Sequence, residues 1–223
     1  MADEKKPLGK LEKRILYELD RDAMQTLGEI GKKINKSPQY VEYWIRKFID
    51  EGYIKNFIAV IDYKRLGYTY YHTYHSLRGM SPKMEDEFGR YDIDVAIFAK
   101  DPLELYDVMS KINEDYGNKI GNSTIETHVG AYHFGRRYLY EEAEPEVHVP
   151  ITGGPVERME IDEEEIRLIS ALKENARAST IELADVSGLT PDVVRYRLKK
   201  LKESKIFLRA TFLPGKGYPY RFY

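Results

Sequence analysis

The two ends of this sequence repeat each other, and no other feature constrains its fold as strongly. Shifted by 153 positions, the ends align without a gap over about 45 residues. The identities are Arg14, Leu19, Ala23, Glu29, Pro38, Val41, Tyr43 and Lys47, which recur as Arg167, Leu172, Ala176, Glu182, Pro191, Val194, Tyr196 and Lys200. A chain of 223 residues with this pattern is expected to fold as two similar small modules that flank a different middle part.

Each copy is predicted to contain three helices. Apolar residues at helical spacing indicate the first, and residues typical of a helix N-terminus indicate where the second and third begin. The second helix opens with a capping box, in which a hydroxyl and a glutamate three residues later satisfy backbone N–H groups. The third opens with a hydroxyl residue at the N-cap and a proline at the first helical position. The capping boxes are Thr26 with Glu29 and Ser179 with Glu182, and the third helices begin at Ser37-Pro38 and Thr190-Pro191. Because only about three residues separate these helices, each copy is predicted to be a helix-turn-helix.

The third helix of each copy is the predicted DNA reader. It buries an apolar stripe at i, i+4 and i+7, so its opposite face is free for DNA. The residues expected to contact DNA from these helices and their N-caps are Ser37, Gln39, Tyr40, Tyr43, Arg46, Lys47, Thr190, Arg195, Tyr196, Arg197, Lys199 and Lys200. A basic helix face is also often only solvated, and Glu42 gives this alternative more weight in the first copy, where it would lie against phosphates. The second copy is therefore expected to be the better reader.

An extended segment follows each third helix. Ile54 to Ile61 is predicted to form a strand that leads into the middle of the protein. Ile206 to Leu213, a Pro-Gly-Lys-Gly turn and Tyr218 to Tyr223 are predicted to form a hairpin, the wing of the second module. From this wing Arg209, Lys216 and Arg221 are expected to contact the DNA backbone or minor groove, which positions a protein without specifying the sequence that it reads.

Charge is unevenly distributed, although the whole chain has a net charge of only −2. Residues 141–165 contain 1 basic and 10 acidic residues, whereas residues 166–223 contain 12 basic and 5 acidic ones. The last quarter of the chain is thus a basic module behind an acidic tether, and a basic module is the electrostatic pattern of a phosphate-binding domain. The partner predicted from it is double-stranded DNA.

The N-terminal copy and the residues after it resemble a known family. Leu11 to Tyr68, a stretch that ends in Leu-Gly-Tyr, resembles the N-terminal half of the Lrp/AsnC (feast/famine) regulators. The Gly-x-Tyr-Asp of residues 89–92, with the strand and helix after it, resembles the family's middle domain. The resemblance implies a sequence-specific DNA-binding transcription regulator, in which a winged helix-turn-helix is followed by an α+β ligand-sensing and dimerisation domain.

Two departures from this family modify the expected fold. Only about ten residues lie between the first middle strand and residue 89, too few for a full helix and a strand. A reduced ferredoxin-like sheet is therefore predicted, with strands 68–78, 92–99 and 123–134 around one helix, 102–115. This reduction puts the family's small-molecule effector in doubt. The second departure is the C-terminal winged helix-turn-helix, which the usual members lack.

The expected fold class is α+β, in four parts. They are an N-terminal winged helix-turn-helix at 8–62, a reduced α+β dimerisation domain at 63–140, an acidic linker at 141–160 and a C-terminal winged helix-turn-helix at 161–223. A sheet of three strands leaves an apolar face or an open edge that needs a partner. The chain is therefore predicted to form a homodimer through its middle domain.

Histidines in the middle part suggest zinc, but their spacing does not support a metal site. His72 and His75, at i and i+3 of one strand, point to opposite faces of a sheet. Together with His128 and His133 they lack carboxylate or thiolate ligands at matching spacing, so neither a metal nor a cofactor is predicted. The sequence has no cysteine and no apolar run of roughly 20 residues, which favours a cytoplasmic protein without a membrane segment.

Two alternative functions stay open. In the first, the C-terminal module holds DNA while the aromatic, near-neutral N-terminal module binds a basal transcription factor, so that the chain is an adaptor. In the second, the chain is an enzyme, because some haem-pathway decarboxylases resemble this regulator family and His72, His75 or Arg78 would then react. No acid and base at plausible spacing supports catalysis, so an enzyme is not predicted. The composition, with 32% charged residues and no cysteine, is typical of a thermophilic or archaeal source.

Overall fold

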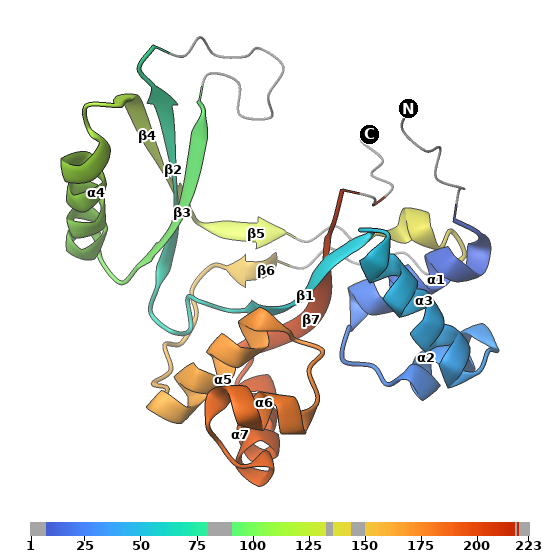
Figure 1. Cartoon of the computed structure of the whole chain (residues 1–223). Helices are drawn as coiled ribbons and strands as arrows, with labels where there is room; N and C mark the ends of the chain where they lie inside the picture. The colour runs from blue at the N-terminus through green and yellow to red at the C-terminus, as the bar shows by residue number, and fades with distance from the viewer. Residues whose placement is uncertain (1–7, 80–90, 133–135, 144–149, 217, 219–223) are drawn as a thin grey trace. The chain divides into compact units, whose positions relative to one another are not determined.

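The structure is a computed structural model that describes residues 8–79, 91–132, 136–143, 150–216 and 218. The chain divides into two compact units (Figure 1). The head unit comprises residues 1–61, 133–149 and 161–223, and the middle unit comprises residues 62–132 and 150–160. The α+β fold class expected from the sequence is confirmed, with a helix-turn-helix at each end and a reduced sheet in the middle. Among the described residues, no helix is both long and apolar enough to cross a membrane.

The head unit contains two copies of one module. The first head consists of α1 (Lys10–Arg21), α2 (Leu27–Ile34), α3 (Pro38–Asp50) and β1 (Ile54–Ile61). The second head consists of α5 (Glu163–Glu174), α6 (Thr180–Ser187), α7 (Pro191–Glu203) and β7 (Phe207–Pro214). Every element of the second head begins and ends 153 positions after its counterpart in the first. A short 3₁₀ helix, η1 (Arg137–Leu139), contacts α1.

Local hydrogen bonds explain why both heads form the same helix-turn-helix. At the start of α2 the Glu29 N–H donates to the Thr26 hydroxyl at 3.2 Å, and the Thr26 N–H donates to the Glu29 carboxylate at 2.7 Å. Ser179 and Glu182 repeat this capping box at the start of α6 with the same two distances. Both helices then end in a residue of left-handed conformation, which turns the chain toward the third helix. The predicted capping boxes are confirmed.

Strands β1 and β7 pair with each other as an antiparallel two-stranded sheet that joins the two heads (Figure 1). Phe57 lies opposite Phe212, and Ile58 lies opposite Thr211. The predicted C-terminal hairpin is therefore wrong in its pairing, because the partner of β7 is the strand of the first head. Of the segment expected to complete the hairpin, only Tyr218 is described, and residues 219–223 lie outside the described residues.

The helices cover this shared sheet crosswise, since α1 packs against β7 and α5 packs against β1. The buried side chains of this core include Ile15, Leu19, Phe57, Leu168, Leu172 and Phe212. Each such side chain contributes about 1.5–3 kcal/mol when it is removed from water. The two heads thus share one core and form one compact unit, whereas the sequence suggested separate modules at 8–62 and 161–223.

The middle unit contains a three-stranded antiparallel sheet of order β3-β2-β4, built from β2 (Thr69–Leu77), β3 (Ile93–Ala99) and β4 (Ile120–His128). Helix α4 (Pro102–Tyr116) covers one face of it, and Tyr71, Ile97, Ala99 and Leu105 form the buried core between them. Odd-numbered residues of β2 point toward this core and even-numbered residues point away, as strand geometry requires. The predicted strands 68–78 and 92–99 and the predicted helix 102–115 are confirmed.

The structure differs from the sequence prediction between residues 128 and 160. The strand expected over 123–134 is divided: β4 ends at His128, and β5 (Gly130–Tyr132) pairs with β6 (Pro150–Gly153) in a separate two-stranded sheet. Leu139 and Ala143 are buried in the head unit. Of the linker expected over 141–160, the described residues 141–143 belong to the head unit and 150–160 to the middle unit, and residues 144–149 lie outside the described residues.

Candidate nucleic-acid interface

Helix α7 of the second head presents a polar face opposite its buried side. The Thr190 hydroxyl caps the helix by accepting from the Val193 N–H at 3.4 Å. Val194 and Leu201 are buried. The opposite side chains are exposed, and they include Arg195, Tyr196 and Lys199. Tyr196 has an exposed fraction of 65%.

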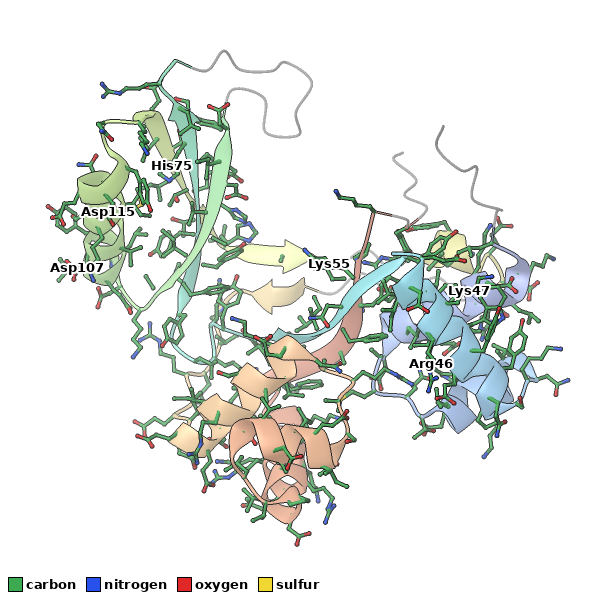
Figure 2. All side chains as sticks on the ribbon, viewed as in Figure 1. Arg46, Lys47, Lys55, His75, Asp107 and Asp115 are labelled. Carbon is green, nitrogen blue, oxygen red and sulfur yellow. The ribbon has the colours of Figure 1, made fainter. Side chains whose placement is uncertain are left out.

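Helix α3 of the first head has the same construction with different chemistry. The Ser37 hydroxyl accepts from the Tyr40 N–H at 3.2 Å, and the buried side is Val41, Ile45 and Phe48. The exposed side includes Gln39, Tyr43 and Arg46, and Figure 2 shows Arg46 and Lys47 on this helix. The predicted apolar stripe is confirmed in both heads, except that Leu198 of α7 is only half-buried.

Most cations of the two exposed faces pair with a carboxylate of their own helix. Arg46 lies 2.6 Å from Glu42. Arg195 pairs with Asp192, and Lys199 lies 3.7 Å from Glu203. Exposed pairs of this kind contribute little to stability, about 0–1 kcal/mol. A phosphate or a base edge can therefore replace the carboxylate at small cost, and these cations stay available to DNA.

Two predicted DNA contacts of α7 instead connect it to α5. Arg197 is mostly buried and pairs with Asp162 and Glu164 at the start of α5. Lys200 lies 2.7 Å from Glu165, whose side chain is only 2% exposed. This hydrogen bond raises the pKa of Lys200, and the Glu165 N–H lowers the pKa of Asp162. Both cations therefore connect α7 to α5 within the second head.

Three other predicted contacts have partners within the head unit. The Tyr40 hydroxyl donates to Glu12 at 3.4 Å. The Lys47 ammonium lies 4.6 Å from the centre of the Trp44 ring. Arg209 lies on the shared sheet and donates to the Asp20 carbonyl at 3.4 Å, so it connects the heads and does not lie on a wing. Lys216, by contrast, is exposed just after β7.

Lys55 is an exposed cation of the first head that was not among the predicted DNA contacts. Lys55 lies at the start of β1 (Figure 2), between the buried Ile54 and the half-buried Asn56. It lies at an irregularity of the β1–β7 register, where Ile54 pairs with Pro214 and Asn56 pairs with Leu213. Because this irregularity depends on pairing with a strand far away in the chain, the local sequence around Lys55 does not predict it.

The histidines of the middle unit lie on opposite faces of the sheet, as their spacing predicts. His75 points to the α4 side (Figure 2), where its ring nitrogens lie 3.1 Å from the Thr73 hydroxyl and 2.8 Å from the Ser123 hydroxyl. Burial lowers the pKa of His75, which favours the neutral ring. His72 points to the other face, and its Nδ1 lies 2.9 Å from Asp94. His133 lies outside the described residues.

The sheet face opposite α4 is rich in aromatic rings, and we call it the aromatic face. It consists of Tyr70, His72, Tyr74, Phe98 and His128. Tyr70 stacks on Phe98 at a centroid distance of 4.7 Å, and His72 stacks on Tyr74 at 5.7 Å. His128 lies opposite Tyr70 in the β2–β4 register, and its ring centre lies 4.9 Å from that of Tyr70 and 5.0 Å from that of His72. The face is one continuous row of rings, with Asp94 at its edge.

Comparison with known proteins supports the fold of the heads. A family model described as winged helix-turn-helix DNA-binding matches residues 8–55 and again residues 161–206. No curated protein sequence matches the chain significantly. The matched segments are the two heads themselves, up to the strand that follows each third helix. The winged helix-turn-helix predicted from the sequence is therefore confirmed as a DNA-binding fold.

Solved structures share the fold at low sequence identity. A crystal structure of the siroheme decarboxylase NirDL in co-complex with an iron-uroporphyrin III analogue covers 92% of this chain at 13% identity, with a TM-score of 0.58. Another crystal structure of NirDL has a TM-score of 0.57 and also covers 92% of this chain. The chain spans 65–66% of the NirDL chains. E. coli AsnC matches 56% of this chain and 95% of its own, at 17% identity and a TM-score of 0.46. At these identities the likeness to NirDL is one of fold.

Proposed function

We propose that this chain is a sequence-specific transcription regulator of the Lrp/AsnC type, which binds duplex DNA with the exposed faces of α3 and α7. One observation supports this function above all others. Both heads have a winged helix-turn-helix whose third helix buries one side and exposes an aromatic and basic side. The third helix of each head is the second helix of the helix-turn-helix motif, and proteins with this motif insert it into the major groove.

The exposed side chains divide into two roles. Arg195 lies near the N-terminus of α7, where helix-turn-helix proteins contact base edges, and its planar guanidinium suits the two acceptors of guanine. Lys199 lies one turn later and suits a phosphate, which adds affinity without sequence preference. In the first head, Gln39 lies in the first turn of α3, and its amide suits adenine.

Substitutions of α7 are expected to separate these roles. Lys199→Ala should weaken binding to every duplex and reduce the slope of log affinity against log salt by about 0.9. Arg195→Ala should relax preference at one base pair, by about 1–3 kcal/mol. Fluorescence anisotropy of the full-length protein on labelled duplexes, repeated across a salt series, measures both effects.

Two further variants are the controls for this experiment. Lys111→Ala removes an exposed charge from α4 in the middle unit and should leave the salt slope unchanged. Lys200→Ala should lower stability, because it leaves the buried Glu165 without its 2.7 Å partner. The proposal is contradicted if the protein binds no duplex at low salt, or if Lys111→Ala and Lys199→Ala reduce the slope equally.

The aromatic face favours a second function, in which it binds a tetrapyrrole. The fold shared with the siroheme decarboxylase NirDL suggests this class of ligand. His72 Nδ1 lies 2.9 Å from Asp94 Oδ1, and this contact orients the imidazole ring on the face. Stacked rings around such a histidine suit a flat aromatic ligand. The same face is the surface that we propose for the predicted homodimer, and ligand binding and self-association would compete for it.

A titration with an iron uroporphyrin tests this second function. If the aromatic face holds a tetrapyrrole, the visible absorbance of the ligand shifts on binding, and His72→Ala weakens binding by about tenfold or more, which corresponds to at least 1.4 kcal/mol. Tyr196→Ala in the second head is the matched control and should bind the ligand normally. An unchanged spectrum at high protein concentration excludes this function and leaves the DNA-binding proposal intact.

A further inference from the structure

The shared sheet relates the two heads by an approximate two-fold axis within one chain. Ile58 lies opposite Thr211, and these two residues are themselves equivalent positions of the repeat. On one side of this pair Phe57 lies opposite Phe212, and on the other side Ala59 lies opposite Ala210. The repeat exchanges these flanking pairs, which is the signature of a two-fold contact. The axis therefore passes between Ile58 and Thr211.

Hydrogen bonds outside the sheet follow the same symmetry. The Ala23 N–H, just after α1, donates to the Ala210 carbonyl at 3.0 Å. Its equivalent, the Ala176 N–H after α5, donates to the Phe57 carbonyl at 3.0 Å. Each head is thus tied to the strand of the other by an equivalent bond. The symmetry belongs to the whole head unit, with its helices, and not to the two strands alone.

The direction of this axis determines how the heads can meet DNA. Two adjacent antiparallel strands are related by an axis perpendicular to their sheet, so the helices of both heads cover the same face. Two DNA readers related by such an axis match inverted half-sites, because a DNA duplex also has two-fold axes perpendicular to its length. One chain therefore has the symmetry that separate helix-turn-helix proteins obtain by dimerisation.

The two readers nevertheless differ at equivalent positions. Gln39 of α3 corresponds to Asp192 of α7, and Glu42 corresponds to Arg195. Tyr43 and Tyr196 are identical and both exposed, at 58% and 65%. The shared tyrosines retain a common docking surface, whereas the base-reading positions carry different chemistry. Equal half-sites would leave one of the two readers mismatched.

We propose that a single chain binds one duplex through two inverted but unlike half-sites, one read by α3 and the other by α7. This inference rests on the proposed DNA-binding function. The partner is a non-palindromic site with half-site centres about one helical turn apart or a multiple of it. Guanine contacts are expected under Arg195, and adenine contacts under Gln39.

Selection of binding sites from a randomised duplex pool tests the proposal, with the full-length protein and with Arg195→Ala and Gln39→Ala. The wild type should select one asymmetric pair of half-sites. Each variant should relax base preference in one half only, by about 5- to 150-fold for a lost bidentate contact. Sedimentation with the selected duplex should give one chain per site, whether or not chains also associate through their middle units.

Each other outcome has a definite meaning. A palindromic site that takes two chains, or an Arg195→Ala variant that relaxes both halves equally, overturns the inference while DNA binding stands. Failure to enrich any sequence, with no binding at low salt, overturns the proposed function and the inference with it. Circular dichroism of the variants establishes that relaxed preference does not come from unfolding, since both substituted side chains are exposed.

Discussion

Phe212→Ala is expected to destabilise both heads together, by about 3–5 kcal/mol. The Phe212 side chain is 1% exposed and lies opposite Phe57 across the shared sheet. The centre of its ring lies 5.5 Å from the centre of the Tyr218 ring and 4.6 Å from the Arg136 guanidinium carbon. Truncation leaves a cavity at the junction of the heads, so the loss of stability cannot stay within the second head.

Urea unfolding can follow the first head by a signal of its own, because the chain has one tryptophan and it lies in that head. Trp44 fluorescence reports α3, whereas far-ultraviolet circular dichroism reports all helices. Both signals should shift to lower urea together in Phe212→Ala, although the substitution lies in β7. Val186→Ala, at a 67% exposed position of α6, is the control and should change stability by less than about 0.5 kcal/mol. An unshifted Trp44 transition in Phe212→Ala would show that the heads unfold independently.

Asp20→Ala is expected to have the largest electrostatic effect, again about 3–5 kcal/mol, because it leaves a mostly buried cation without its partner. The Asp20 side chain is 2% exposed, lies 2.7 Å from an Arg136 Nη1 and accepts from the Thr211 hydroxyl at 3.0 Å. After the substitution the guanidinium and the hydroxyl both lose this acceptor. Thermal or urea unfolding of the purified variant measures the loss.

The repeat provides a matched control for this variant. Lys173 occupies the equivalent position at the end of α5, and its side chain is exposed. Lys173→Ala should change stability by less than about 0.5 kcal/mol. Equal effects of the two substitutions would mean that the loss comes from the helix end and not from the buried ion pair, which would refute this explanation of the Asp20 site.

Local features of the fold could be predicted from the sequence, and long-range pairing could not. The capping boxes at Thr26 and Ser179 depend on residues three positions apart, so the pattern alone locates them. The alternation along β2 likewise predicts which side of the sheet His72 and His75 occupy. The predicted pairing of β7 was wrong because a mostly apolar strand followed by a Pro-Gly turn satisfies a hairpin equally well. Only the tertiary fold brings β1 into reach.

The candidate site divides in the same way. Exposure of Arg195 and Tyr196 follows from the position of the buried stripe on α7, which the sequence predicts. Arg197 and Lys200 lie on the same helix, but the carboxylates that engage them belong to α5. A helical pattern shows which way a side chain points and says nothing of the partner that it meets. Packing between α5 and α7 therefore decides their role.

Because both heads belong to one chain, they can also evolve differently from the two equivalent heads of a homodimer. In a homodimer each substitution appears on both sides of the axis at once, so a new contact in one half-site must be tolerated in the other. Here the halves vary separately. Asp20 faces Arg136 while its counterpart is an exposed lysine, and Glu42 has Arg195 as its counterpart. The exposed faces of α3 and α7 can thus change independently, while the sheet between the two heads stays common to both.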